Sequence, residues 1–91
     1  MTKIDLSDRI SKKTGLPLED CQKAVNAFMD VVKDALTSKD NVYLRGFGTF
    51  SSKERAQKVA RDIQKNTQII VPAHRVPHFL PSKEFKLALR D

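Results

Sequence analysis

The chain has 91 residues, a single cysteine and a formal net charge of +6. Its length fits one domain, one cysteine excludes an intrachain disulfide, and no apolar run reaches the ~20 residues of a membrane-spanning helix. Residues 1–41 are electrically neutral and residues 42–91 carry the whole net charge, which suggests a polyanion-binding face on a neutral base, although a basic protein without such a partner would look the same.

The first predicted helix covers residues 3–14. Thr2 and Asp5 stand at capping-box spacing, and Gly15 suits the left-handed position that ends a helix. Asp5 and Asp8 also interrupt any apolar core of a signal peptide, so we expect a cytoplasmic protein.

Residues 18–38 are predicted to form the longest helix, with Pro17 tolerated at its start. Apolar residues recur there every three or four positions, and Cys21, Phe28 and Met29 share this face. The face is too wide for the first helix to cover, so strands or a second subunit must cover the rest. We interpret Phe28 and Met29 as core residues rather than ligand-binding ones, and Cys21 as an inert thiol rather than a nucleophile.

The next segment alternates in polarity and predicts strands. Residues 42–45 form the first strand, after a turn in which Asn41 can take the left-handed conformation. Residues 46–48 form a tight hairpin connection whose two glycines permit positive φ. Residues 49–58 continue as one long strand, and their polarity indicates that it leaves the core and runs into solvent.

Residues 59–72 have too few apolar side chains to build a core of their own. Arg61 and Lys65 lie on either side of the isolated Ile63, and a return strand is predicted from about Gln68. We interpret this segment as a protruding β-ribbon arm that grips a negatively charged partner.

The chain then returns to the core and ends in a helix. Pro72 and Pro77 are expected to interrupt strand pairing, which suits a sheet edge or the base of the ribbon. Phe79 goes back to the core, and Ser82 is a good N-cap for a last helix over residues 83–90.

Several local motifs occur together along the whole chain. They are the hairpin Gly46-Phe47-Gly48-Thr49-Phe50, the basic arm residues Arg55-Ala56 and Arg61, and the return stretch Pro72-Ala73, Val76-Pro77-His78-Phe79, Pro81 and Lys83-Glu84. With the order of elements, they resemble the bacterial histone-like HU/IHF family. The resemblance implies an α+β fold in an intertwined dimer, with a helical dimerisation base over residues 1–41, the sheet and DNA-binding arm over 42–81, and a C-terminal helix over 82–91.

The resemblance also implies which residues meet each partner. DNA would contact the saddle, the arm and its flanks through Arg45, Lys53, Arg55, Lys58, Arg61, Ile63, Lys65, Arg75, Lys83 and Lys86. The dimer core would contain Phe28, Met29, Val32, Leu44, Phe47, Phe50 and Phe79. A homodimer is expected, and a heterodimer with a related chain stays possible.

The arm tip departs from the family pattern. Arg61-Asp62-Ile63 stands where the family has Arg-Asn-Pro, whose proline wedges between base pairs. Isoleucine is among the residues that insert between base steps, so Ile63 is the candidate wedge; burial in a local arm cluster is the alternative. Asp62 brings a negative charge near phosphate, and Asn66 can still supply positive φ for the turn.

Arg45 raises a second question. Arg45-Gly46-Phe47-Gly48 and residues 76–79 are more similar to the sequence-selective IHF β-type subunit than to typical HU. In that subunit the arginine enters the minor groove, where arginine reads narrow A·T-rich stretches. The alternative is that Arg45 caps a solvent-exposed strand end.

The predicted function is therefore architectural binding of double-stranded DNA through its minor groove and phosphates, with low sequence specificity, in the nucleoid. A sequence-selective IHF-like subunit is the alternative, and an RNA-binding module is disfavoured because Tyr43 is the only stacking aromatic outside the expected core. His74 and His78 have neither a nucleophile partner nor zinc spacing, so we expect no enzyme activity, metal, cofactor or small-molecule substrate.

Overall fold

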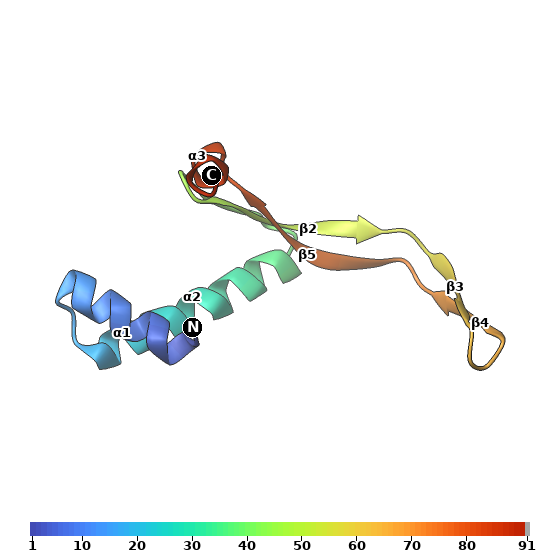
Figure 1. Ribbon diagram of the computed structural model, residues 1–91, viewed down its shortest axis with the longest axis horizontal. Helices are drawn as coiled ribbons and strands as arrows, with labels where there is room; N and C mark the ends of the chain where they lie inside the picture. Colours follow the sequence, from blue (N-terminus) through green and yellow to red (C-terminus); the bar gives the residue numbers. More distant parts are fainter. Residues whose placement is uncertain (91) are drawn as a thin grey trace.

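The structure is a computed structural model that describes residues 1–90. It is elongated, with extents of 57 × 30 × 30 Å; helices α1 and α2 lie at one end and a two-stranded arm at the other (Figure 1). The elements follow the order α1 (Lys3–Thr14), α2 (Leu18–Thr37), β1 (Val42–Leu44), β2 (Gly48–Arg55), β3 (Lys58–Asp62), β4 (Thr67–Val71), β5 (His74–Pro81) and α3 (Lys83–Ala88).

Helix α1 begins and ends as its sequence predicts. The Thr2 side chain accepts a hydrogen bond from the Asp5 backbone N–H, and the Asp5 carboxylate accepts one from the Thr2 N–H at 2.9 Å. These bonds hold the pKa of Asp5 below its usual value. Gly15 ends the helix with φ 78°, a left-handed conformation that glycine adopts without a steric penalty.

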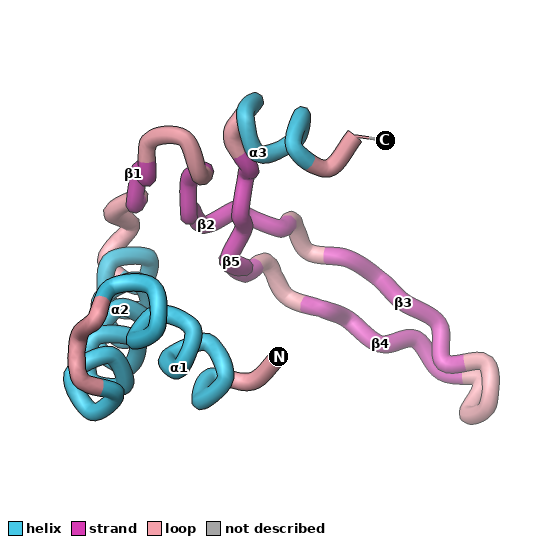
Figure 2. Tube along the Cα trace, turned by 60° about the vertical axis from the view of Figure 1, so that its left-hand side comes forward, coloured by secondary structure: helices cyan, strands magenta, loops and turns pink. Residues whose placement is uncertain are grey.

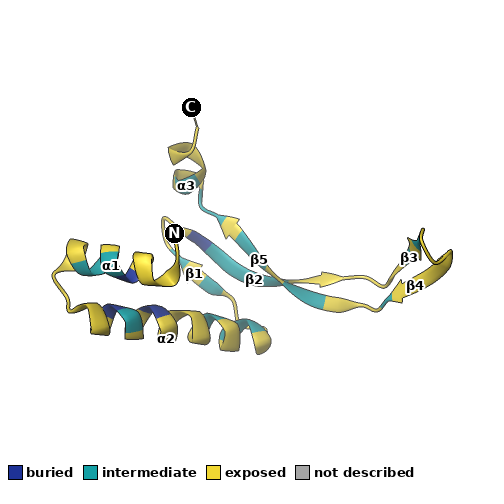
Figure 3. Ribbon diagram, turned by 60° about the horizontal axis from the view of Figure 1, so that its bottom comes forward, coloured by how far each residue is buried: buried dark blue, intermediate teal, exposed yellow. Residues whose placement is uncertain are grey.

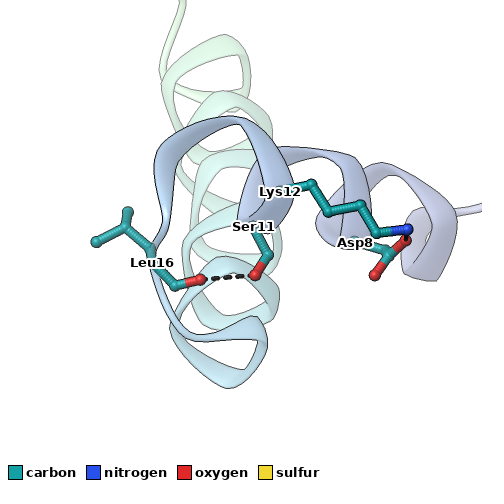
Figure 4. Close-up of polar contacts among 4 residues, drawn as sticks. All are labelled: Asp8, Ser11, Lys12 and Leu16. Atoms are coloured by element: carbon teal, nitrogen blue, oxygen red, sulfur yellow. Dashed lines mark hydrogen bonds and ion pairs between the residues drawn. The ribbon is translucent and has the colours of Figure 1, made fainter.

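The connection between α1 and α2 is held by a side-chain hydrogen bond. Ser11 donates from Oγ to the carbonyl oxygen of Leu16 at 2.6 Å, and the neighbouring residue Lys12 forms an ion pair with Asp8 at 2.8 Å (Figure 4). The hydrogen bond with Asp8 raises the pKa of Lys12, but both side chains are exposed, so the pair contributes little stability.

The end of α2 differs from the prediction. Lys39, with φ 60°, takes the left-handed position that was predicted for Asn41. The Lys39 N–H donates to the carbonyl of Leu36 and the Asp40 N–H to that of Ala35 at 2.8 Å. This is the hydrogen-bond pattern of a Schellman motif, which needs a left-handed residue two positions after the last helical one. The left-handed residue is therefore Lys39 because of where α2 ends, although asparagine adopts that conformation more readily than lysine.

The strands form two sheets. The first is antiparallel in the order β1-β2-β5, and the second pairs β3 with β4 (Figure 2). The single long strand predicted over residues 49–58 is wrong, because β2 ends at Arg55 and β3 begins at Lys58. Residues 72–73 interrupt the returning side of the ribbon at the same level, so the arm is a separate two-stranded unit beyond a break.

Pro77 does not interrupt pairing as the sequence suggested. It lies inside β5, opposite Ser52 of β2. Because β5 is an edge strand with only β2 beside it, a residue without an N–H is tolerated where that position faces outward. Pro72 does fall at the break between β4 and β5.

The two glycines of the hairpin serve different needs. Gly46 has φ 80°, as predicted, but Gly48 has no positive φ. A Cβ on Gly48 would lie 2.6 Å from the Leu80 carbonyl oxygen and 2.6 Å from the Phe79 ring. Gly48 is therefore required by the close approach of β5 and not by its own backbone conformation.

Five phenylalanines join the sheet to α2 and α3. Phe47 packs on Phe79 and Phe85 with ring centroids 5.2 and 5.4 Å apart. Phe50 lies 4.8 Å from Phe79 and 6.3 Å from Phe28 of α2. The cluster thus connects the hairpin, β5 and both helices.

One chain buries very little of itself (Figure 3). Among the described residues only Ser7, Cys21, Val25 and Gly48 are buried. The accessible surface is 7926 Å², whereas a compact chain of this mass exposes roughly 5,400 Å². The radius of gyration is 18.5 Å, against about 12 Å for a compact domain of this length. The fold therefore leaves a large area for a second chain to cover.

Candidate nucleic-acid interface

The strand register divides the main sheet into two faces. Side chains alternate along each strand, and cross-strand partners share a face. One face, here called the core face, carries Phe50, Phe79, Ser52 and Arg75 and packs on α2. The opposite face, here called the saddle face, carries Tyr43, Thr49, Ser51, Lys53, Arg55, His74, Val76, His78 and Leu80.

Lys53 and Arg55 lie on the saddle face and are exposed, as expected for DNA-contacting residues. His74 is the cross-strand partner of Arg55, and its Nδ1 lies 2.8 Å from the Pro72 carbonyl oxygen. The Nδ1–H of His74 therefore donates to that carbonyl, and Nε2 is left for another partner. The base of the arm thus combines two polar side chains on one face.

Arg75, which the resemblance placed among the DNA contacts, lies on the core face. Its guanidinium donates to the Leu36 and Thr37 carbonyls at the end of α2, and to Ser52 Oγ at 2.8 Å. The guanidinium is thus directed to the helical base and away from Lys53 and Arg55. Strand alternation places Arg75 on the face of Phe79, four positions along β5, but its partners at the end of α2 could not be read from the sequence.

The arm carries its basic residues on both sides. Lys58 pairs with Val71, and Arg61 pairs with Gln68, three positions further along β3. An odd spacing on a strand puts Lys58 and Arg61 on opposite faces. The arm can therefore contact a partner from more than one direction.

The tip is a turn over residues 63–66. Ile63 is 90% exposed, so its alternative placement in a buried arm cluster is wrong. Asn66 has φ 50°, as predicted, and its side-chain oxygen accepts a hydrogen bond from Arg61 Nη2 at 3.3 Å. Asp62 Oδ1 accepts from the backbone N–H groups of Gln64 and Lys65.

The remaining predicted contacts lie on exposed positions. Arg45 occupies the turn between β1 and β2, beside Gly46. Lys83 and Lys86 are exposed on α3, and Lys65 is exposed at the tip. They lie around the sheet and the arm rather than in one compact site.

The basic side chains of the sheet, arm and α3 are free of carboxylate partners within residues 1–90. The only ion pairs found there, Lys12–Asp8 and Lys23–Glu19, are both inside the two N-terminal helices. The net positive charge of residues 42–91 is thus available to an external anion.

Sequence reasoning missed the histidines as members of this face. His74 and His78 lie four positions apart on β5, on the side of Lys53 and Arg55. A period-two count from Phe79, which returns to the core, would have placed both on the opposite face. In the part of the chain that the structure describes, no group of three or more His, Cys, Asp or Glu residues could hold a metal ion.

The predicted dimer core is only partly covered in one chain. Phe28 is 46% exposed, and Met29 and Phe47 are also exposed. Val32, Leu44, Phe50 and Phe79 are half-buried. An open groove of about 580 Å³ lies between α2 and the sheet, beside Val32 and Phe50. Apolar side chains left at such a groove indicate an interface with another chain.

Over the described part of the chain, no helix has both the length and the apolar character to cross a bilayer.

Residues 1–90 match the model of the family described as bacterial DNA-binding protein. DNA-binding protein HU of Geobacillus stearothermophilus is 38% identical over 90 residues, covering 99% of this chain and 100% of that protein. HU of Lactococcus lactis is 42% identical over 88 residues, 97% of each chain. Integration host factor subunit alpha of Aliivibrio salmonicida is 33% identical over 91 residues, 100% of this chain and 93% of that protein.

Solved structures agree with the sequence matches. A cocrystal structure of HU from Anabaena with DNA has a TM-score of 0.93 at 31% identity, over 98% of this chain and 97% of that one. HU from Thermotoga maritima has a TM-score of 0.69 at 23% identity, over 99% of this chain and 100% of that one, and supports the fold alone. The chain belongs to the bacterial DNA-binding protein family that includes HU and the integration host factor subunits.

Proposed function

We propose that the chain is an architectural DNA-binding protein that works as a dimer, receives double-stranded DNA on the saddle face between two arms, and bends it with little sequence preference. The observation that carries this proposal is the saddle face itself. It presents Lys53 and Arg55 without carboxylate partners, and it continues into an arm whose apolar tip residue, Ile63, is almost fully exposed.

Binding would draw most of its free energy from phosphates. Each lysine or arginine that meets a phosphate releases condensed counterions, so affinity falls steeply as salt rises. With about six to ten such contacts, the dissociation constant should rise by roughly 10³ to 10⁵ between about 50 and 200 mM salt. No base-edge hydrogen bond is needed for this term, so sequence preference stays weak.

The arm tip would supply the bend. Ile63 would insert from the minor groove and partly unstack one base step, at a cost of a few kcal/mol that the extra wrapped surface offsets. Its exposed position on a protruding turn suits this role. Easily kinked, nicked or already bent DNA should then bind more tightly than a stiff duplex.

The Ile63→Ala variant tests the wedge by fluorescence energy transfer between the ends of a labelled duplex. We expect a smaller bend and weaker binding, with an unchanged salt slope, because the substitution removes no charge. An unchanged bend and affinity would exclude Ile63 as the wedge. Competition with single-stranded RNA in the same titration would show whether the partner is duplex DNA.

A sequence-selective, IHF-like role is the second candidate, and the exposed turn position of Arg45 favours it. An arginine placed there could enter a narrow A·T-rich minor groove. Binding to random duplexes of different A·T content would separate the two roles. If Arg45→Met removes a preference for A·T-rich DNA, Arg45 reads groove shape; if it lowers affinity for all duplexes equally, it only contacts phosphate.

The proposed function also implies an oligomeric state and a place in the cell. We propose a homodimer, because the open groove beside α2 and the exposed Phe28 are present in every copy of the chain. A DNA-compacting protein of this kind would be associated with the nucleoid in the cytoplasm. A measurement of the molecular mass of the purified chain in solution distinguishes the two cases: a homodimer has twice the mass of the chain, whereas a subunit of a heterodimer stays monomeric without its partner.

A further inference from the structure

We propose that Asp62 is a positioning residue for DNA bending: its carboxylate builds the turn that presents Ile63 to the duplex. This inference rests on the bending function proposed above. It adds a structural role to the sequence-based expectation that Asp62 brings a negative charge near phosphate.

The hydrogen bonds of Asp62 carry the proposal. Asp62 is the last residue of β3 and pairs with Thr67 of β4, so the four residues between them must reverse the chain. Its Oδ1 accepts from the Gln64 N–H at 3.1 Å and from the Lys65 N–H at 3.3 Å. An aspartate that bonds backbone groups two and three residues ahead closes a turn from its own side chain.

The other end of the turn is held as well. Asn66 takes a left-handed conformation with φ 50°, one that asparagine tolerates better than most residues. Its Oδ1 accepts from Arg61 Nη2 at 3.3 Å. Asp62 just before the turn and Asn66 at its last position, bonded to Arg61, thus hold both ends of the turn.

Side chains have to do this work because the turn contains neither glycine nor proline. Its four residues are Ile63, Gln64, Lys65 and Asn66. Ordering a free backbone on binding costs about 1–2 kcal/mol per residue, and a turn that is already closed avoids part of that cost. A closed turn also gives Ile63 one direction, while its side chain stays 90% exposed.

The negative charge of Asp62 and its hydrogen-bond acceptor are expected to affect DNA binding in different ways. The negative charge opposes phosphate binding, whereas the Oδ1 acceptor supports the turn. Asp62→Asn removes the charge and keeps an oxygen acceptor; Asp62→Ala removes both. Glu54→Ala is a control for net charge, because it removes one carboxylate from the core face of β2, opposite Arg75, without touching the turn.

The experiment measures affinity and bend for the full-length dimer on an end-labelled duplex at low salt. The lost charge alone should make both Asp62 variants bind DNA about two- to fivefold more tightly, and Glu54→Ala should gain less, because Glu54 lies on the face away from the DNA. Asp62→Asn and Glu54→Ala should bend DNA like the parent protein. Asp62→Ala should bend it less, and its affinity gain should shrink or vanish.

A second measurement reports on the turn without DNA. Heteronuclear nuclear Overhauser effects of the backbone amides of residues 63–66 should be as high in Asp62→Asn as in the parent, and lower in Asp62→Ala. If the parent protein bends DNA and the Asp62→Ala variant bends it equally, the positioning role of Asp62 is overturned, but the bending function is not. A parent protein that binds but does not bend DNA would overturn the bending function, whatever the amide data show.

Discussion

Arg75 of β5 donates a hydrogen bond from Nη2 to Ser52 Oγ of β2 at 2.8 Å, and the same guanidinium donates to the Leu36 and Thr37 carbonyls at the end of α2. The last carbonyls of a helix lack partners within the helix and carry a partial negative charge. Arg75 therefore connects the end of α2 to β2 and β5 near the base of the arm, on the face opposite Lys53 and Arg55.

Removal of the Arg75 hydrogen bonds should lower the stability of the fold and leave the electrostatics of DNA binding unchanged. For Arg75→Met we expect a loss of about 1–3 kcal/mol in the free energy of unfolding, because hydrogen bonds from a charged donor are lost. The slope of log affinity against log salt should stay unchanged. Urea unfolding at fixed protein concentration and duplex titrations at several salt concentrations measure the two quantities.

Arg55→Met is the matched variant on the saddle face. Its salt slope should become shallower by about one per DNA-contacting copy, because one phosphate contact is lost, while its stability stays within about 0.5 kcal/mol of the parent. If Arg75→Met flattened the salt slope as much as Arg55→Met, the assignment of the two faces would fail.

Gly48 should tolerate no side chain. A Cβ there would lie 2.6 Å from a backbone oxygen of Leu80, and the backbone cannot move aside cheaply. We expect Gly48→Ala to destabilise the protein by about 3 kcal/mol or more, as overpacking at a backbone contact does. Thermal unfolding followed by circular dichroism measures the loss.

Gly46→Ala is the control for that substitution. Gly46 has φ 80° but open space around the position of a Cβ, so only backbone strain opposes alanine. We expect a cost of about 1–2 kcal/mol. Equal losses at Gly46 and Gly48 would mean that the close approach of β5 is not the reason for glycine at position 48.

Phe28 should matter to the dimer more than to one chain. It contacts Phe50 at 6.3 Å between ring centroids but remains 46% exposed. The unfolding temperature of the parent should rise with protein concentration, as it does when folding and association are coupled. Phe28→Ala should raise the dimer dissociation constant in sedimentation equilibrium.

Ile63→Ala provides the comparison for that experiment, because Ile63 is apolar and exposed at the far end of the arm. It should leave the dimer dissociation constant unchanged. A Phe28→Ala variant as tightly associated as Ile63→Ala would place the interface elsewhere.

The capping box of α1 predicts a response to acid. The backbone N–H of Thr2, and then its side chain, lower the pKa of Asp5 by bonding to its carboxylate. A carboxyl group whose pKa is lower in the folded state contributes stability at pH above its ordinary range, and this contribution is lost as pH falls through the lowered value. A carbon-13 titration should find the Asp5 midpoint below that of an unstructured aspartate. Thr2→Ala should recover only part of the shift, because the backbone donor remains.

The helices and the order of strands were predictable because local chemistry dictates them. The Thr2–Asp5 capping box, Gly15 and the Ser82 cap all act within a few residues, and the structure contains each of them. The same holds for Asn66, whose left-handed conformation is a property of that residue in a turn.

The errors concern relations between distant segments. The hydrogen bonds of Arg75 depend on the position of the end of α2 beside β5, and the need for Gly48 depends on Phe79 and Leu80. The break between Arg55 and Lys58 likewise matches an interruption on the opposite strand. Alternation from a core residue such as Phe79 indicates the face of each strand residue, but the partners of that residue on other elements had to come from the structure.

The measurement that tests the function most directly is a titration of the purified chain alone with an end-labelled DNA duplex at about 50 and 200 mM salt, the range over which phosphate contacts dominate. We predict tight binding at low salt, a loss of affinity of roughly 10³-fold or more at the higher salt, and energy transfer between the duplex ends on binding. Binding that is insensitive to salt, or a duplex that stays straight when saturated, would contradict architectural DNA binding by this chain.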